Sequence, residues 1–181
     1  PQGLSHASEL VTQIAEMNRG HFIDGEVEEC HHSQFCIGVA GYPEKHAESP
    51  NMETDMKWLK AKVDAGASYI VTQMSFDNRK ILSFIERCRE YGIGVPVIPG
   101  IKPFSTKAQL TLLPQTFHVD LPEELVREVE RCDDNRQVRE VGVEWAIRQG
   151  RELIEAGVPV LHFYTMGKTD NVVKIAEALF R

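Results

Sequence analysis

The sequence predicts an α/β fold with parallel strands, and more specifically part of a (βα)8 TIM barrel. Short apolar runs rich in β-branched residues alternate with longer helical patterns, and this alternation is typical of parallel strands joined by helical crossovers. Polar side chains follow several of these runs, at the strand ends where parallel α/β folds bind ligands. A whole barrel needs about 250 residues, and this chain has 181. We therefore expect a single barrel domain over residues 1–181 that lacks its N-terminal part and holds roughly the C-terminal five βα units.

The first elements follow from the spacing of apolar residues. Residues 8–17 place apolar side chains at a helical period. The run FCIGVAGYP, residues 35–43, is short and apolar and ends in turn residues, as a buried strand does. The next helix, 51–65, has Asn51 as its N-cap and Gly66 just beyond its end.

The alternation continues through the rest of the chain. Two β-branched strands, SYIVTQMSF at 68–76 and VPVIPGI at 95–101, flank a helix over 78–91 that ends before Gly92. After them we expect a short helix, a weak strand, two helices, a strand and a last helix, over 105–113, 117–122, 122–132, 135–156, 158–165 and 170–180. The first of the two successive helices carries proline in its first turn, where the missing N–H costs no hydrogen bond.

Composition excludes several classes of protein. The chain has 42% hydrophobic residues, a net charge of −7 and no basic cluster. That is enough apolar material for one core, and such an acidic chain is poorly suited to nucleic-acid phosphates. No apolar run reaches about 18 residues, and the N-terminus shows no signal-peptide pattern, so we expect no membrane segment. Four cysteines are too few for a disulfide scaffold, which favours a reducing cytoplasm.

A short segment superficially suggests a metal site. CHHSQFC places Cys30, His31, His32 and Cys36 close together. Zinc sites usually space paired ligands as CxxC or HxxxH, and this segment shows neither spacing cleanly. We therefore expect a polar connection that runs into a strand, and no metal site.

One flank of the helix over 51–65 carries an unusual set of side chains. At about 100° per residue, Asp55, Trp58 and Lys62 fall together beside the apolar face. They could form an ordinary solvated flank, which is the norm on amphipathic helices. They could also bind a ligand, with a carboxylate for ribose hydroxyls, an ammonium for phosphate and an indole beside a flat ring.

The other polar residues near strand ends suit the rim of a barrel. No GxGxxG follows a predicted strand and no GxxxxGK[ST] occurs, so Rossmann and P-loop folds lack their main support. The rim residues are Tyr42, His46, Gln73, Lys102, His162, Tyr164 and Lys168.

Four ordered motifs carry a family resemblance. They are CIGVAGYPEKH, DMKWLKAKVDAGASYIVTQMSFD, VPVIPGIKP and LHFYTMGK, within residues 36–168. Together they resemble methylenetetrahydrofolate reductase. The resemblance implies a flavoprotein with a catalytic (βα)8 barrel that reduces 5,10-methylenetetrahydrofolate to 5-methyltetrahydrofolate. The reductant would be NADH or NADPH, acting through FAD, in one-carbon metabolism and methionine synthesis. We also expect a homo-oligomer of unspecified size.

The resemblance implies a cofactor site. In this family the loop after the fourth strand and the helix that follows it hold FAD. Tyr42 and His46 match positions in that loop, and Asp55, Trp58 and Lys62 match positions on that helix. Ala7, in HASELV, resembles another FAD-lining position. Their chemistry suits the role, because Lys62 is a point charge for the diphosphate and Asp55 can accept from hydroxyl groups. Trp58 stands at a position where the residue type varies.

The resemblance also implies folate contacts at Gln73, Gln109 and Lys168. Gln73 matches a residue that contacts folate and nicotinamide in turn, and its amide can both donate and accept. Many relatives have Arg where Lys168 stands, so Lys offers a point charge in place of a bidentate fork.

The resemblance places the catalytic acid outside this sequence. In the family, the general-acid Glu and a flavin-contacting Asp belong to an LRGD-like motif, and PQGLSHASEL resembles the continuation just after it. We therefore expect the general acid upstream of Pro1, and no catalytic residue is assigned within residues 1–181.

Three alternatives stay open. Another flavin barrel, proline-dehydrogenase-like, would need an Arg pair near a strand end, and none is visible. A non-flavin aldolase or isomerase could use Lys102 as a Schiff-base lysine. A non-catalytic fragment would bind FAD and folate without turnover.

Overall fold

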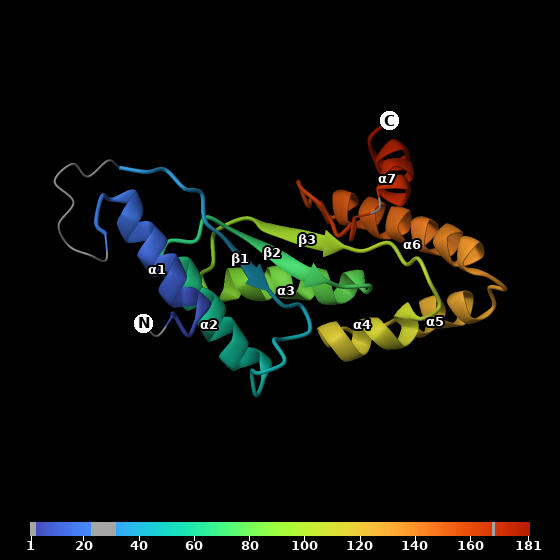
Figure 1. The fold of residues 1–181 in the computed structure, drawn as a ribbon, viewed down its shortest axis with the longest axis horizontal. Coiled ribbons are helices and arrows are strands. Elements are labelled where there is room, and N and C mark those ends of the chain that lie inside the picture. Colours follow the sequence, from blue (N-terminus) through green and yellow to red (C-terminus); the bar gives the residue numbers. More distant parts are fainter. Residues whose placement is uncertain (1–2, 23–31, 168) are drawn as a thin grey trace.

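The structure of the protein is a computed structural model, which describes residues 3–22, 32–167 and 169–181. One parallel sheet with the strand order β1-β2-β3-β4 lies at its centre (Figure 1). The strands are β1 (Gly38–Gly41), β2 (Tyr69–Met74), β3 (Val97–Ile101) and β4 (His162–Phe163). The helices are α1 (Ala7–Asn18), α2 (Met52–Asp64), α3 (Asn78–Glu90), α4 (Gln109–Phe117), α5 (Glu123–Glu130), α6 (Asn135–Glu155) and α7 (Asp170–Phe180).

The strands pair in the order in which the chain forms them, which confirms the predicted parallel α/β sheet. Gly38 opens the β1–β2 ladder opposite Tyr69. Gly100 of β3 pairs with Met74 on one side and His162 on the other. Helices connect β1 to β2 and β2 to β3, as parallel strands require. All four strands therefore present their C-terminal ends at the same end of the sheet.

The predicted strand over 117–122 is wrong. His118 has a left-handed backbone conformation, with φ of 53°, and ends α4. The residues that follow it, up to Pro122, join no ladder. Val119 is buried and packs with Leu121 against α4 and α5, so the apolar pattern reflects burial of a loop. The described residues contain four strands, where the sequence indicates about five.

The start of α4 also differs from the prediction. Residues 105–113 predict a helix, but α4 begins at Gln109. The Gln109 side-chain oxygen accepts the backbone N–H groups of Ser105 at 2.7 Å and Thr106 at 3.4 Å. This side chain therefore holds a turn ahead of the helix, and α4 then continues through Pro114.

Two smaller differences concern the last third of the chain. Pro122 is the N-cap of α5 and does not lie inside its first turn. The run over 158–165 predicts a longer strand than β4, which has two residues. Val160, ahead of β4, is exposed. The other helices match their predicted positions to within a residue or two, and Asn51 caps α2 by accepting the Thr54 N–H at 2.8 Å.

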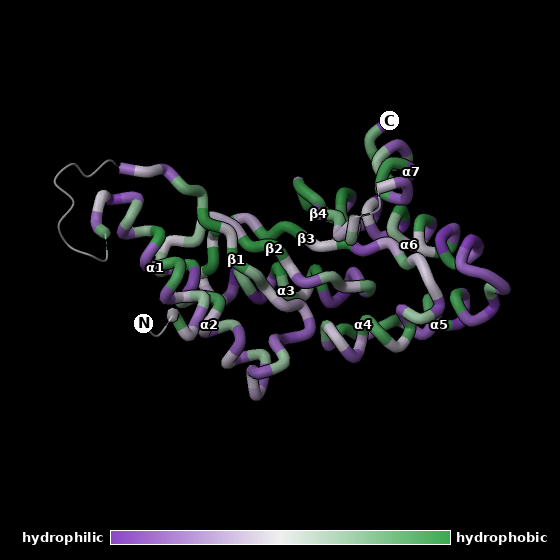
Figure 2. Tube along the Cα trace, viewed as in Figure 1, coloured by the Kyte–Doolittle hydropathy of each residue, from purple (hydrophilic) through white to green (hydrophobic). Residues whose placement is uncertain are grey.

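Helices cover one face of the sheet. α1, α2 and α3 pack against β1 and β2, around Ile70 and Phe84. α3, α6 and α7 pack against β3 and β4, around Ile101 and Leu153. A third cluster, around Leu125, joins α4, α5 and α6 beyond the strand ends. Figure 2 shows hydrophobic residues along the strands and alternating stretches along the helices. Among the described residues, no helix is both long and apolar enough to cross a membrane.

The described helices do not cover the opposite face of the sheet. Gly38 and Ala40 are exposed, and Tyr69, Val71 and Gln73 are half-buried, while the residues between them are buried against the helices. The Tyr69 ring lies over Gly38, where a Cβ atom would come within 2.3 Å of the ring.

A close backbone contact fixes α6 against the loop after β3. A Cβ atom on Gly142 would lie 2.1 Å from the Phe104 carbonyl oxygen and 2.6 Å from its backbone nitrogen. Phe104 is buried, and its ring meets Phe76 edge-on at 5.7 Å. The indole N–H of Trp145, one turn along α6, donates to the Phe76 carbonyl at 3.2 Å. Only glycine permits this approach.

We expect Gly142→Ala to lower the free energy of unfolding by about 1–3 kcal/mol, because the new methyl group meets backbone that cannot rotate away. Alanine is intrinsically the better helix residue by about 1 kcal/mol, so a loss would have to come from the contact. The measurement is the midpoint of urea unfolding. Gly94→Ala is the control, since nothing lies within 4 Å of a Cβ atom there. A Gly142→Ala midpoint at or above that of the control contradicts the assignment.

Candidate functional site

The loop between β1 and α2 is held together by one buried carboxylate. Asp55, in the first turn of α2, is 8% exposed. One of its oxygens accepts the backbone N–H of His46 at 3.1 Å, and the other accepts the Ser49 hydroxyl at 2.8 Å. The N-terminus of the helix also favours a negative charge there. Asp55 therefore shapes the loop, and its oxygens are already engaged within the chain.

Tyr42 and His46 supply two hydrogen-bond donors from this loop. Their rings meet edge-on with centroids 4.7 Å apart. His46 Nδ1 accepts the Glu48 backbone N–H at 3.3 Å, so in the neutral ring the proton lies on Nε2. Burial raises the pKa of Tyr42, and the charges of Asp55 and Glu48 raise it further. The phenol therefore stays protonated at neutral pH and can donate.

Lys62 lies beside this loop at the edge of the sheet. Its ammonium group donates to the Ala40 carbonyl of β1 at 2.7 Å. Burial lowers the pKa of Lys62, and the nearby charge of Asp55 acts in the opposite direction. One ammonium hydrogen is engaged and the others are available to an anion. Trp58, on the same flank of α2, is 62% exposed.

The predicted folate residues lie on other elements. Gln73 stands near the C-terminal end of β2, and its side-chain oxygen accepts the Met74 backbone N–H at 2.9 Å. Since only oxygen can accept that hydrogen, the amide nitrogen is the group left to donate. Gln109 lies at the start of α4, where its oxygen caps the turn described above. Lys168 lies outside the described residues.

Tyr42, His46 and Asp55 therefore form a contacting group, and Lys62 adjoins it at β1. Ala7 is the exposed first residue of α1, a helix that packs beside α2 (Figure 1). Gln73 is on the strand next to β1.

The general acid expected upstream of Pro1 is not tested by this structure. Pro1 itself lies outside the described residues, which begin at Gly3. The absence of an assigned catalytic residue within residues 1–181 therefore stays a prediction from the family resemblance.

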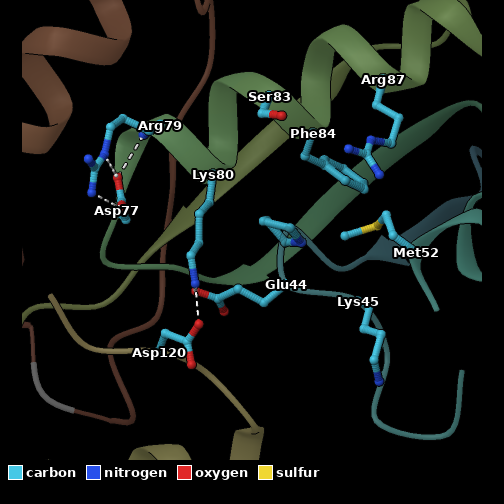
Figure 3. A pocket seen from close by; sticks show the side chains of 11 residues that line it. Glu44, Lys45, Met52, Asp77, Arg79, Lys80, Ser83, Phe84, Arg87 and Asp120 are labelled. Carbon is cyan, nitrogen blue, oxygen red and sulfur yellow. Dashed lines mark hydrogen bonds and ion pairs between the residues drawn. The ribbon is translucent and has the colours of Figure 1, made fainter. Parts of the chain in front are cut away.

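A pocket opens between the β1–α2 loop and α3 (Figure 3). Its volume is about 520 Å³, and its lining includes Met52 and Phe84. Lys80 of α3 bonds both Glu44, at 3.4 Å, and Asp120. Burial raises the pKa of Glu44, and the charge of Lys80 partly offsets this. These pairs tie the loop to α3 and to the connection between α4 and α5.

Sequence reasoning missed Ser49 and the Glu44–Lys80–Asp120 group. Lys80 and Asp120 are 40 residues apart, so no local spacing could have indicated their contact. It also gave no reason for a lowered pKa at Lys102. In the structure this lysine is 6% exposed, and burial lowers its pKa.

No metal centre is visible in the part of the chain that the structure describes, where no three or more His, Cys, Asp or Glu residues gather. Cys30 and His31 lie outside that part, and Cys36 is an exposed free thiol. The donor set at the β1–α2 loop fits an anionic cofactor better. Lys62, the Tyr42 hydroxyl and His46 Nε2 can all bind phosphate oxygens.

A family model described as methylenetetrahydrofolate reductase matches residues 1–180. The chain belongs to the methylenetetrahydrofolate reductase family. Methylenetetrahydrofolate reductase 1 of Schizosaccharomyces pombe is 37% identical over 98% of this chain and 27% of its own length. The 5,10-methylenetetrahydrofolate reductase of Escherichia coli is 34% identical over 96% of this chain. Other relatives are named as NADPH or NADH forms.

A solved structure supports the fold. It is an uncharacterised Clostridium thermocellum protein, described as binding two copies of 5-methyl-5,6,7,8-tetrahydrofolic acid. It aligns with a TM-score of 0.52 and 17% identity over 79% of this chain and 52% of that one. The predicted fold is thus confirmed as a partial (βα)8 barrel of the reductase family. The chain spans 54% of the length of the E. coli reductase.

We expect Asp55→Ala to loosen the loop, because the His46 N–H and the Ser49 hydroxyl lose their acceptor. Loss of a charged hydrogen-bond partner costs about 1.5–3 kcal/mol, so the His46 amide should exchange with solvent about tenfold faster or more. Amide hydrogen exchange resolved by NMR measures this. The control is Asp64→Ala, which removes an exposed carboxylate from the same helix. Equal protection of the His46 amide in both variants would show that Asp55 does not hold the loop.

Proposed function

We propose that this chain is part of a flavoprotein oxidoreductase that reduces 5,10-methylenetetrahydrofolate to 5-methyltetrahydrofolate with NADH or NADPH. Membership of the reductase family over residues 1–180 carries the proposal. The geometry supports it, because phosphate-binding donors and Gln73 lie toward the same end of adjacent parallel strands. Relatives named for each nicotinamide leave both reductants open.

FAD, when bound, would relay a hydride from the reduced nicotinamide to the folate. Lys62 would offset the charge of the diphosphate, and Tyr42 and His46 would donate hydrogen bonds to it or to the ribityl chain. Trp58 and Ala7 would line the same cofactor. Asp55 would contribute chiefly by shaping the loop, since its oxygens serve His46 and Ser49.

Gln73, Gln109 and Lys168 would hold the folate. The Gln73 amide nitrogen is free to donate, which suits a carbonyl on the pterin or on nicotinamide. The Gln109 side-chain oxygen accepts the Ser105 backbone N–H, so a folate contact through this oxygen would have to share or replace that hydrogen bond. We assign no general acid to residues 1–181 and place it upstream of Pro1. The alternative is a chain that binds FAD and folate without turnover. Measuring the two flavin half-reactions distinguishes an active chain from such a binding fragment.

A Schiff-base enzyme is the second candidate, because Lys102 is 6% exposed and burial lowers its pKa. The lowered pKa favours the uncharged amine, which is the nucleophilic form. A yellow, flavin-loaded protein with no borohydride-trapped adduct on Lys102 would remove this candidate.

We also propose a cytoplasmic location, which the free thiols of Cys36, Cys88 and Cys132 support.

We expect Lys62→Ala to weaken FAD binding about tenfold or more, because it removes one charge-assisted contact. Lys60→Ala is the matched control, since Lys60 pairs with Asp64 on another side of the same helix. Fluorescence titration of apoprotein with FAD gives both dissociation constants. If the two variants bind FAD equally well, Lys62 does not contact the cofactor.

We expect Gln73→Glu to stay yellow and folded but to be oxidised more slowly by methylenetetrahydrofolate. The variant keeps the size of the side chain and replaces a donor with a charge, which costs free energy in a half-buried site. Reduction by the nicotinamide should fall less. Stopped-flow absorbance of each half-reaction tests this, and wild-type rates in both would make Gln73 merely structural.

A further inference from the structure

β2 carries one extra residue just before its C-terminal end. Val71 pairs with Ile98, but the next pair joins Met74 to Gly100. Three steps along β2 therefore match two along β3, which defines a β-bulge at Thr72 and Gln73. Bulges of this kind re-aim a side chain, and here the affected side chain is that of Gln73.

The Thr72 hydroxyl takes the place of a backbone group in this bulge. Ile70 N–H donates to the Pro96 carbonyl at 2.9 Å, and continuing this parallel pattern would pair Gly100 N–H with the Thr72 carbonyl. Gly100 N–H instead donates to Thr72 Oγ1 at 2.9 Å. The same hydroxyl donates to the Gln73 carbonyl at 2.9 Å, and Thr72 is fully buried.

The displaced Thr72 carbonyl finds its partner on the far side of β3. Tyr164, just after β4, donates its hydroxyl to this oxygen at 2.9 Å. Its ring crosses Gly100, where a Cβ atom would lie 2.5 Å from the ring and 2.5 Å from the Thr72 oxygen. The missing side chain of Gly100 is therefore what allows Tyr164 to reach β2.

We propose that Thr72 and Tyr164 are positioning residues that fix the bulge of β2 and thereby aim the Gln73 amide at the substrate. This inference rests on the proposed function, in which Gln73 contacts folate. Thr72 holds the Gln73 carbonyl, and Met74 N–H holds its side-chain oxygen. Both oxygens of Gln73 are thus anchored within β2, and the amide nitrogen is left as a directed donor.

The test is a double-mutant cycle in the purified, flavin-loaded protein, with 5-methyltetrahydrofolate as the probe in calorimetry. Thr72→Val keeps the shape and removes the hydroxyl, and Thr72→Ser restores it. We expect Thr72→Val to weaken folate binding about tenfold and Thr72→Ser to return it to within about twofold of wild type. FAD binding should change by less than about twofold in each variant, since the cofactor contacts lie on the neighbouring loop and helix.

The Gln73→Ala background separates positioning from general stability. If Thr72 acts through Gln73, Thr72→Val should change folate binding by less than about twofold once Gln73 is alanine. A tenfold loss that persists in that background would overturn the inference and leave a structural role only. The inference also falls if Thr72→Val binds folate like wild type.

Two further variants allow every outcome of the cycle to be interpreted. If Thr72→Val does not fold, Tyr164→Phe removes one hydroxyl from a half-buried side chain and takes its place in the same cycle. If Gln73→Ala alone leaves folate binding unchanged, the proposed role of Gln73 fails, and the positioning inference fails with it. If Gln73→Ala weakens binding but neither positioning variant couples to it, the inference alone fails.

Discussion

Parallel pairing of consecutive strands is the constraint on which the rest of the structure depends. After each strand, the chain must return to the starting end of the sheet before the next strand can pair in parallel with it. Helices on one face of the sheet make these returns. The residues that follow the strands therefore lie together at the C-terminal end of the sheet. The β1–α2 loop and the end of β2 are neighbours in space only because β1 and β2 are in register from Gly38 opposite Tyr69 to Gly41 opposite Thr72.

Several of the residues matched to the family's ligand contacts also hold the local backbone. Asp55 accepts from His46 and Ser49, Lys62 donates to a β1 carbonyl, and the oxygens of Gln73 and Gln109 each accept backbone N–H groups. These side chains are therefore oriented before any ligand arrives, which lowers the ordering cost of binding. A substitution at such a position changes the geometry of its neighbours as well as its own contact, so controls on the same element are essential.

The sequence predicted the periodic elements well, because burial of one face imposes a spacing that can be read directly. α2, α3 and α6 lie where their apolar periods and caps indicate. The false strand over 117–122 shows the limit of this reasoning, since a loop that buries Val119 has the same apolar signature as a strand. The family resemblance indicated site residues, but their present partners depend on the folded loop and could not be predicted from spacing.

The contact between Tyr69 and Gly38 couples the residues that these two positions of the sheet can accept. The aromatic ring occupies the volume that any side chain at position 38 would need. A larger residue at position 38 requires the Tyr69 ring to turn away or position 69 to carry a smaller side chain. The two positions are thus coupled, and the cost of replacing Gly38 depends on which residue stands at position 69.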